Sequence, residues 1–397
     1  MAVTTTDAAA IRPFTFEFPA ADLEDLRARV AATRFPDRET VDDQSQGTQL
    51  ATVQALARYW ATEHDWRACE AKLNAVPNFI TEIDGLDIHF IHVRSRHDDA
   101  LPLIVTHGWP GSVIEQMKIV DLLTDPTAHG ASAADAFHLV IPSMPGYGFS
   151  GKPTTRGWGP DRIARAWVAL MERLGYATYV ASGGDWGGVI TDLMGVQAPA
   201  GLAGIHTNFP GAVPPEVEQA AISGAPAPTG LSGEEERAYA QLVFVYQHVF
   251  YAYMMASRPQ SLTALADSPV GLAAWMMDHD GRGLQLMSRA FAGDPGGLTR
   301  DDVLDNVTFY WLTNTALSAA RLYAENTSAF FSAKGVTVPV AVSVFPQELY
   351  QPPRSWAELA YPNLIHFNEV EAGGHFAAWE QPELFAAEIR AGFRTLH

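Results

Sequence analysis

A short segment around Asp185 places a carboxylate at a sharp turn. The β-favouring run Thr178–Ala181 leads into Gly183-Gly-Asp-Trp-Gly187, and the apolar run Val189–Met194 follows. This order predicts a strand, a glycine-flanked turn and a helix, with Asp185 at the turn. Glycines two residues to either side suit such a turn, because side chains there would collide with the neighbouring strand and helix. The alternative is that Asp185 only N-caps the helix, a role that aspartate fills readily.

The layout resembles the nucleophile elbow of the α/β-hydrolases, whose usual pattern is Gly-x-Ser-x-Gly, with Asp185 at the position of the serine. In that fold an acid and then a histidine follow the nucleophile along the chain. Glu348 follows the predicted strand Val340–Phe345, and His375 stands behind Gly373-Gly374 after the last predicted strand. A solvated loop glutamate and a core histidine are the alternatives, but neither explains why three such groups occur in this order.

A carboxylate is a poor acyl-transfer nucleophile, but it can displace a leaving group from saturated carbon and form an alkyl-enzyme ester. Water activated by His375, with Glu348 stabilising the imidazolium, would then hydrolyse that ester. Attack on the Asp185 carbonyl carbon creates an oxyanion, for which the backbone N–H groups of Trp109 and Trp186 are the expected donors. Alkyl halides and epoxides both suit this nucleophile. An epoxide oxygen also needs a hydrogen-bond donor, a role for which tyrosine is suited.

Alternating strands and helices must position these groups. Short apolar runs that predict buried strands are followed by helical segments, and the strands in chain order are Leu101–Thr106, Phe137–Pro142, the strand before Asp185, and Gly204–Phe209. This alternation is typical of a parallel, doubly wound sheet. Asp84-Gly85 between two β-favouring runs predicts a hairpin. Before it, Leu50–Val76 is predicted to be helical.

The alternation stops after Phe209 and resumes at Val338, and it ends with a predicted helix over Pro382–Leu396. Between them lies an Ala-, Tyr- and Met-rich stretch that predicts helices, placed where this fold carries a lid. We therefore expect an α/β-hydrolase fold with a helical lid insertion and an N-terminal wrapping segment. The predicted division is an N-terminal segment, a first part of the core, a lid and a second part of the core, over 1–78, 79–210, 211–327 and 328–397.

Composition restricts the class of partner and compartment. The 397 residues include 26 basic and 45 acidic ones, a net charge of −19, which disfavours nucleic acid and anionic membranes as partners. Cys69 is the only cysteine, so a disulfide framework and a cysteine metal site are excluded, and a reducing cytoplasm is the simplest setting. Met1–Pro13 has no signal-peptide pattern, and Leu242–Ala256 is too short to span a bilayer. No cofactor and no metal are expected.

The motifs together resemble the epoxide hydrolases of the microsomal type, including their soluble fungal and bacterial relatives. The resemblance covers nearly the whole chain from Phe14 onward. It rests on His107-Gly-Trp-Pro-Gly-Ser112, Pro145-Gly-Tyr-Gly-Phe-Ser150, Gly183-Gly-Asp-Trp-Gly187, Asp267-Ser-Pro-Val-Gly-Leu-Ala-Ala-Trp275, Asn306, Tyr310-Trp311, Phe345-Pro-Gln-Glu348 and Gly373-Gly-His-Phe-Ala-Ala378.

The resemblance implies that Asp185 is the nucleophile, Glu348 the acid partner and His375 the base. It also implies two lid tyrosines that hold the epoxide oxygen. By motif one is Tyr323, and the other is Tyr253, with Tyr251 close enough in sequence to remain an alternative. The resemblance further implies a small apolar epoxide as substrate and an N-terminal domain that wraps the core and lid. With no membrane anchor before Phe14, the chain is expected to be a soluble member, and a homodimer is one compatible assembly.

Two other functions stay open at this point. One is haloalkane dehalogenation, which halide release and the dispensability of the lid tyrosines would distinguish. The other is a non-catalytic binding protein on the same fold, which tight ligand binding without turnover would indicate. An intact set of Asp185, Glu348 and His375 with its oxyanion loop counts against the second.

Overall fold

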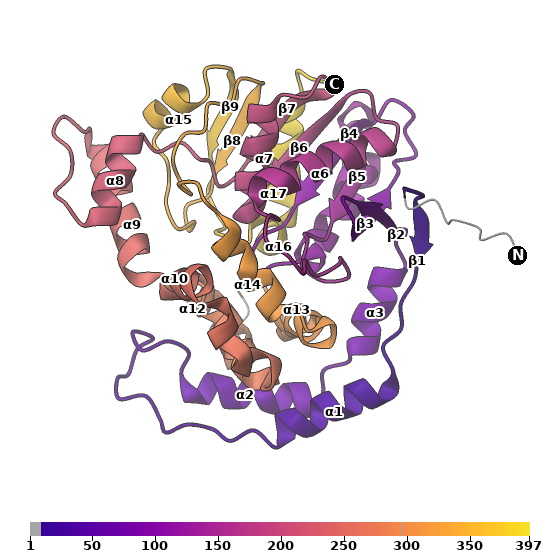
Figure 1. Cartoon of the computed structure of the whole chain (residues 1–397), viewed down its shortest axis with the longest axis vertical. Coiled ribbons are helices and arrows are strands. Elements are labelled where there is room, and N and C mark those ends of the chain that lie inside the picture. The colour runs from indigo at the N-terminus through magenta and orange to yellow at the C-terminus, as the bar shows by residue number, and fades with distance from the viewer. Residues whose placement is uncertain (1–8, 295) are drawn as a thin grey trace, which may run out of the picture.

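The computed structural model describes residues 9–294 and 296–397. The first part of Met1–Pro13, for which the sequence predicts no signal peptide, lies outside the described residues. Within them one sheet has the strand order β1-β2-β3-β5-β4-β6-β7-β8-β9 (Figure 1). The strand bounds are β1 Arg12–Phe14, β2 Asn78–Ile83, β3 Leu86–Val93, β4 Leu101–Thr106, β5 Phe137–Pro142, β6 Tyr179–Gly183, β7 Leu202–Thr207, β8 Val340–Val344 and β9 Leu364–Glu369.

The predicted hairpin and the mostly parallel sheet are both confirmed. Strands β2 and β3 pair antiparallel up to Ile83 and Leu86, and the two turn residues Asp84 and Gly85 have φ of 53° and 80°. Two positive φ values in a two-residue loop match the twist of the flanking strands. Strand β3 is antiparallel to β5, and the strands from β5 to β9 in the sheet order are all parallel.

Successive residues of the central strands belong to two different hydrophobic clusters. Ile104 of β4 packs with the first cluster, while its neighbours Leu103 and Val105 pack with the second. Side chains alternate between the faces of a strand, so the two clusters cover opposite faces of the sheet. Both faces are buried, which explains why these strands are nearly continuous apolar runs.

Helices of the core cover both clusters. α6 packs beside α7 in the first cluster, and α17 packs beside α5 in the second. The helices of the core are α4 Val113–Gln116, η1 Met117–Ile119, α5 Val120–Thr124, η2 Pro126–His129, η3 Ala133–Asp135, α6 Pro160–Arg173, α7 Trp186–Gln197, α15 Arg354–Ala360, α16 Ala377–Glu380 and α17 Pro382–Phe393. The last of these ends at Phe393, shortly before the predicted Leu396.

The stretch between β7 and β8 is helical, as its composition predicts. Its helices are α8 Pro215–Ser223, α9 Gly233–His248, α10 Phe250–Ser257, η4 Pro259–Ala266, α11 Pro269–Met277, α12 Gly281–Ala292, α13 Arg300–Thr313 and α14 Ala316–Glu325. Ser232 and Thr299 form capping boxes at the starts of α9 and α13, which satisfies backbone N–H groups that helix geometry leaves free. We call α8 to α14 the lid helices.

The N-terminal helices α1 (Ala20–Ala31) and α2 (Leu50–Thr62) pack against the lid helices from the side away from the sheet (Figure 1). Helix α3 (Trp66–Asn74) contacts α13 and packs with the second hydrophobic cluster. Trp60 donates its indole N–H to Thr308 at 3.0 Å, and the Tyr59 hydroxyl donates to Asp301 at 2.9 Å. The helical stretch predicted over Leu50–Val76 is divided into α2 and α3. The chain breaks before α3 because Asp65 N-caps that helix, accepting from the Arg67 N–H at 3.0 Å.

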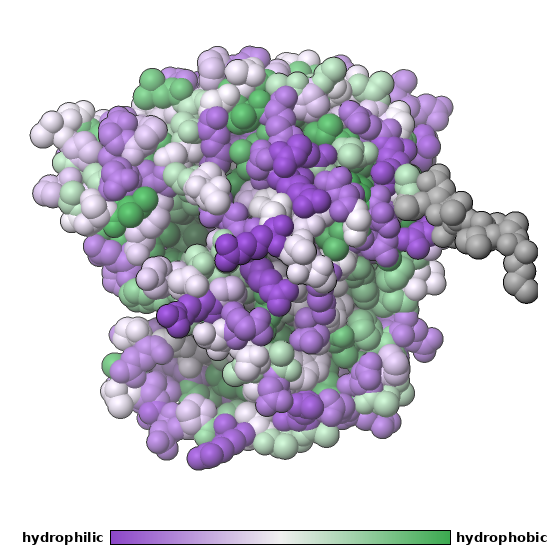
Figure 2. All heavy atoms as spheres, viewed as in Figure 1, coloured by the Kyte–Doolittle hydropathy of each residue, from purple (hydrophilic) through white to green (hydrophobic). Residues whose placement is uncertain are grey.

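Hydrophilic and hydrophobic residues are interspersed over the face shown in Figure 2. Among the described residues, none of the helices is long and apolar enough to cross a bilayer.

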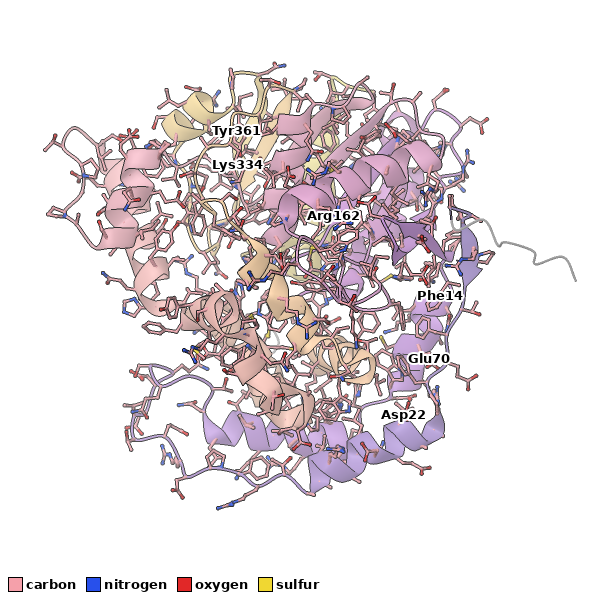
Figure 3. The ribbon with its side chains drawn as sticks, in the orientation of Figure 1. Phe14, Asp22, Glu70, Arg162, Lys334 and Tyr361 are labelled. Atoms are coloured by element: carbon pink, nitrogen blue, oxygen red, sulfur yellow. The ribbon has the colours of Figure 1, made fainter. Side chains whose placement is uncertain are left out.

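A buried carboxylate in the interior has two partners, Lys334 and Tyr361, which are labelled close together in Figure 3. The Tyr361 hydroxyl donates to Asp192 at 3.0 Å, and the Lys334 ammonium lies 3.9 Å from the same carboxylate.

Candidate active site

Asp185 occupies the turn between β6 and α7. Its φ of 51° and ψ of −128° are rare for a residue with a side chain, and such strained backbone is found at functional sites. The side chain is buried. It makes no capping hydrogen bond to α7 in the described structure, so the alternative that Asp185 serves only as an N-cap side chain is wrong.

Close backbone approaches explain the glycines around this turn. A Cβ at Gly183 would overlap with the backbone of Gly187 in α7, and a Cβ at Gly187 would overlap with the Thr106 carbonyl at the end of β4. A Cβ at Gly108 would overlap with the Asp185 carboxylate itself. The turn therefore fits only because these positions lack side chains, and the expected collisions with strand and helix are present.

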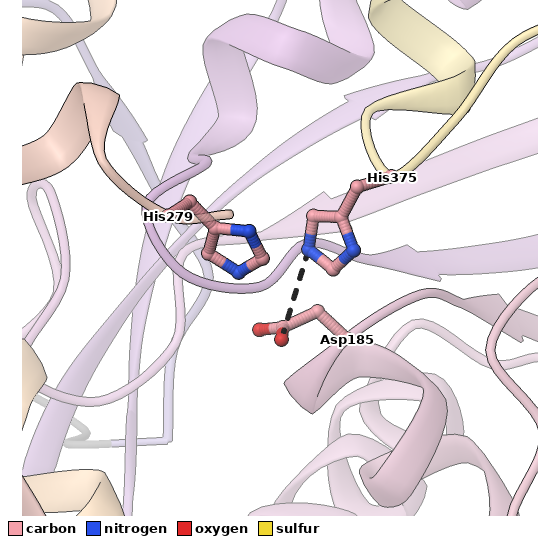
Figure 4. A group of neighbouring side chains, drawn as sticks. All are labelled: Asp185, His279 and His375. Carbon is pink, nitrogen blue, oxygen red and sulfur yellow. Dashed lines mark ion pairs between the residues drawn. The ribbon is translucent and has the colours of Figure 1, made fainter. Parts of the chain in front are cut away.

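The predicted acid and base lie beside the aspartate. His375 follows β9, and its Nδ1 lies 2.7 Å from Oε1 of Glu348, which follows β8. Its Nε2 faces the other way, 3.8 Å from Oδ2 of Asp185 (Figure 4). The structure therefore brings Asp185, Glu348 and His375 together at the carboxyl ends of neighbouring parallel strands, where α/β folds place their sites.

Carboxylates surround the His375 imidazole. Burial alone would lower the pKa of His375, but the charge and hydrogen bond of Glu348 and the charges of Asp185 and Asp280 outweigh it and raise the pKa to about 10. The resting site therefore favours an imidazolium between two carboxylates. Any reaction that removes the charge of Asp185 removes one of these contributions and makes His375 easier to deprotonate.

One oxygen of Asp185 is already held by a backbone donor. The Trp109 N–H donates to Oδ1 at 2.7 Å, from the loop that follows β4. Trp186 is the first residue of α7, and the first N–H groups of a helix have no partner within it. Both predicted oxyanion donors thus belong to segments adjoining the carboxylate, and only the Trp109 bond is formed in the described geometry.

A second histidine stands beside the first. The His279 ring lies 4.1 Å from the His375 ring, centroid to centroid, and is inclined by 30° to it (Figure 4). Its Nδ1 is 2.9 Å from Oδ2 of Asp280, and its buried Nε2 has no hydrogen-bond partner among the described residues. One ligand-type atom from each of Asp185, His279 and His375 lies within 4.8 Å of the others. His279 and Asp280 therefore form a second imidazole–carboxylate pair.

An apolar pocket opens onto Asp185 under the lid helices. It has a volume of about 270 Å³. Its walls come from the nucleophile turn, from α9 and α10 and from the end of α14, and include Asp185, Trp186, Phe209, Tyr251, Tyr253, Tyr323 and Phe330. A pocket of this size and lining suits a small apolar molecule.

Burial favours Tyr251 over Tyr253 as the second lid tyrosine, a choice that the motif leaves open. The Tyr253 side chain lines the pocket but is 70% exposed, whereas Tyr251 lies with its ring 6.0 Å from that of the buried Tyr323. Burial first, and then the charge of Asp185, raise the pKa of Tyr251 well above its usual value. Burial, Tyr251 and Asp185 do the same for Tyr323, so both phenols stay protonated.

The family described as the epoxide hydrolase N terminus matches residues 11–116, and the α/β-hydrolase fold matches residues 102–228. A protein of Stigmatella aurantiaca, provisionally named an epoxide hydrolase, is 51% identical over 97% of this chain and 85% of its own length. Epoxide hydrolase 1 of Oryctolagus cuniculus is 35% identical over 96% of this chain and 88% of its own length. This chain belongs to the epoxide hydrolase family.

Solved structures of epoxide hydrolases agree. Juvenile hormone epoxide hydrolase from the silkworm Bombyx mori superposes with a TM-score of 0.85 and 29% identity, covering 98% of this chain and 96% of that one. Aspergillus niger epoxide hydrolase gives a TM-score of 0.81 and 30% identity, covering 98% and 97%. The expected family and fold are therefore confirmed.

Sequence reasoning missed the second imidazole–carboxylate pair of this epoxide hydrolase. The signal was available as Asp278-His-Asp280 directly before the glycine that begins α12, a pattern in which Asp280 N-caps the helix. Its side chain accepts from the Arg282 N–H at 2.8 Å and from the Gly283 N–H at 3.0 Å. The cap fixes Asp280, and Asp280 in turn fixes the orientation of His279.

Proposed function

We propose that this epoxide hydrolase converts a small apolar epoxide and water into a vicinal diol through a covalent ester on Asp185. The observation that supports this most directly is the unequal treatment of the two carboxylate oxygens. Oδ1 accepts the Trp109 N–H at 2.7 Å, whereas Oδ2 lies 3.8 Å from His375 Nε2. A carboxylate held by one oxygen can present the other to an electrophilic carbon in the pocket.

The first half-reaction forms the ester. Oδ2 of Asp185 attacks an epoxide carbon, the carbon–oxygen bond of the ring breaks, and the epoxide oxygen takes a proton from Tyr251 or Tyr323. Both phenols are protonated, Tyr323 is buried and Tyr251 is half-buried, so their hydrogen bonds strengthen as charge develops on that oxygen. An alkyl halide needs no such donor, and the paired phenols therefore favour the epoxide.

The second half-reaction hydrolyses the ester. Esterified Asp185 carries no charge, so one of the carboxylates that raise the pKa of His375 is lost and the imidazole becomes a more effective base. Water attacks Cγ, its proton passes to His375 Nε2, and Glu348 stabilises the imidazolium. The Trp109 and Trp186 N–H groups stabilise the oxyanion, and the acyl carbon–oxygen bond then breaks. The departing alkoxide takes the proton from His375 to complete the diol, and the proton left on the Asp185 carboxyl returns to the tyrosinate.

The organisation of the chain supports this proposal. We infer an N-terminal segment over 1–78, a core in two parts over 79–210 and 328–397, and a lid over 211–327 that supplies both tyrosines. A reducing cytoplasm suits the buried, unpaired thiol of Cys69. A homodimer is part of the proposal, and sedimentation velocity would test it.

A single-turnover reaction in heavy-oxygen water tests the covalent step. With enzyme in excess over epoxide, the label is expected in the Asp185 carboxylate and not in the first diol formed, and mass spectrometry of the peptide containing Asp185 detects it. Asp185→Ala should abolish turnover and leave the melting temperature close to that of the native enzyme. Label found directly in the diol would mean that water attacks the epoxide itself and would overturn the proposal.

A further inference from the structure

A second, small cavity is also lined by Asp185. It has a volume of about 20 Å³, and its lining includes Asp185, His375, Trp109, Glu115, Gln116 and Asn208. A cavity needs roughly 10–15 Å³ to hold one water molecule and also needs two to four polar partners. This cavity meets both conditions and is far too small for a substrate. Asp185 also lines the large pocket under the lid, but the other walls of the two cavities differ.

The polar side chains of this cavity include an acceptor without a donor. Gln116 donates its side-chain N–H to Glu115 Oε1 at 2.6 Å. Its own Oε1 is buried and accepts from no group in the described part of the chain. A buried amide oxygen without a donor is unfavourable, so a water that donates to it would satisfy a real deficit.

Glu115 is a buried carboxyl group outside the triad. Its carboxyl fills the space beside Gly111, where a Cβ would overlap with it. Burial raises the pKa of Glu115 to about 8, against the opposing effects of Gln116 and His375. A neutral carboxyl adds no second negative charge beside Asp185, and it can either donate to a water molecule or accept from it.

We propose that Glu115 and Gln116 hold the hydrolytic water in this cavity, beside Cγ of Asp185 and away from the substrate pocket. The proposal rests on the covalent mechanism above. One water proton passes to His375 Nε2, the other stays on the water oxygen and forms a hydrogen bond to Gln116 Oε1, and an oxygen lone pair remains for Cγ. The new bond joins the water oxygen to Cγ, and the acyl carbon–oxygen bond to the substrate breaks. The departing alkoxide takes the proton from His375, and Asp185 keeps the oxygen of the water.

The two half-reactions separate this role from a structural one. Glu115→Met and Gln116→Met remove polar atoms from the cavity but leave Asp185, the lid tyrosines and the pocket unchanged. Stopped-flow kinetics with an epoxide whose binding changes tryptophan fluorescence, together with quenched-flow mass spectrometry of the adduct, would measure each step. Alkylation should stay within about twofold of the native rate, and hydrolysis should slow about 10- to 100-fold, the scale expected when a water loses a hydrogen bond to a polar group. Glu115→Gln should recover most of the loss.

Glu218 supplies a matched control. It is a buried glutamate of α8 that accepts from the Phe331 N–H at 3.0 Å and from the Tyr246 hydroxyl, and it lines neither cavity. Glu218→Gln should lower the melting temperature without changing the ratio of the two half-reaction rates. A crystal structure should show an ordered water within hydrogen-bond distance of Gln116 Oε1.

The experiment separates a failure of the proposed water site from a failure of the covalent mechanism. If the native enzyme forms no adduct and no label enters Asp185, the mechanism itself fails. If the adduct forms but both methionine variants hydrolyse it at the native rate, the water site is wrong. The same conclusion follows if those variants slow both half-reactions equally and Glu115→Gln restores neither, since that pattern indicates a structural role. Should one variant fail to fold, the other carries the test.

Discussion

His375 is needed at only one stage of the proposed cycle. His375→Gln should still form the ester and then stall, because the amide can fill the space but cannot accept the proton of water. Loss of a general base slows its step by about 10²- to 10⁴-fold. Intact-protein mass spectrometry with substrate should show a stable adduct. Glu348→Gln should slow hydrolysis less, since an amide still orients the imidazole, and native activity in that variant would mean that another residue is the acid partner.

The lid tyrosines Tyr251 and Tyr253 are expected to respond differently to the same substitution. Tyr251→Phe and Tyr323→Phe should each slow alkylation, because a hydrogen bond to developing charge contributes about 1.5–3 kcal/mol, or roughly ten- to two-hundred-fold in rate. Tyr253→Phe should stay within about twofold of the native enzyme, since its side chain is 70% exposed. Pre-steady-state alkylation rates measure this. The reverse pattern would restore Tyr253 as the oxygen-binding residue.

Local sequence decides some elements and leaves others undetermined. The turn at Asp185 and the hairpin at Asp84-Gly85 are predictable because close backbone approach or positive φ demands glycine at fixed positions. Which side chains of α10 point toward the pocket is not predictable in the same way. Residues two apart on a helix point about 200° apart. Packing against α14 therefore decides that Tyr251 and not Tyr253 lies near Tyr323, and no local pattern contains that contact.

The same limit applies to the groups near His375. His279 comes from the loop between α11 and α12, and Glu115 from the short helix after β4. Their proximity to the triad depends on contacts between segments far apart in the chain. The triad itself was predictable because the order of strands in this fold fixes where each loop ends. No comparable rule of the fold places His279 or Glu115.

The close contact between α7 and the end of β4 should make the protein sensitive to a side chain at Gly187. Gly187→Ala should destabilise the enzyme by about 1–3 kcal/mol or more, because the added methyl overlaps with the Thr106 carbonyl and neither backbone can move freely. Gly281→Ala, at the start of α12, is the control, since its Cβ would meet nothing within 4 Å. Urea unfolding midpoints measure both. Equal stability of the two variants would show that α7 can shift away from the sheet.

At the scale of the whole molecule, stability should fall on mild acidification. His206 is buried in β7, between the hydroxyls of Ser182 at 2.9 Å and Ser343 at 3.0 Å. Burial lowers its pKa to about 3, although the charge of Glu388 opposes this. The folded state therefore favours neutral His206. The resulting stabilisation is complete above the unfolded pKa of about 6.5 and is lost as the pH falls toward 3.

Between pH 7 and pH 5 this group alone should cost the native enzyme about 2 kcal/mol in its free energy of unfolding, at about 1.4 kcal/mol per pKa unit. His206→Gln should be less stable at pH 7 but should lose less on acidification. The same substitution at the exposed His248 should leave the pH dependence unchanged. Urea titrations at the two pH values provide the measurement, and parallel losses in native enzyme and His206→Gln would contradict the assignment.

Asp185 lines both cavities, and in the proposed mechanism they hold the epoxide and the water separately. If the epoxide arrives from the lid side and water waits on the other, an alkyl group that fills its pocket does not obstruct the water. A bulky substituent would then affect how fast the ester forms but not how fast it is cleared. Libraries that reshape the pocket walls could therefore broaden the range of epoxides accepted without a penalty in the release step. Conversely, a competitive inhibitor lodged under the lid would protect the free enzyme but would not trap an ester already formed.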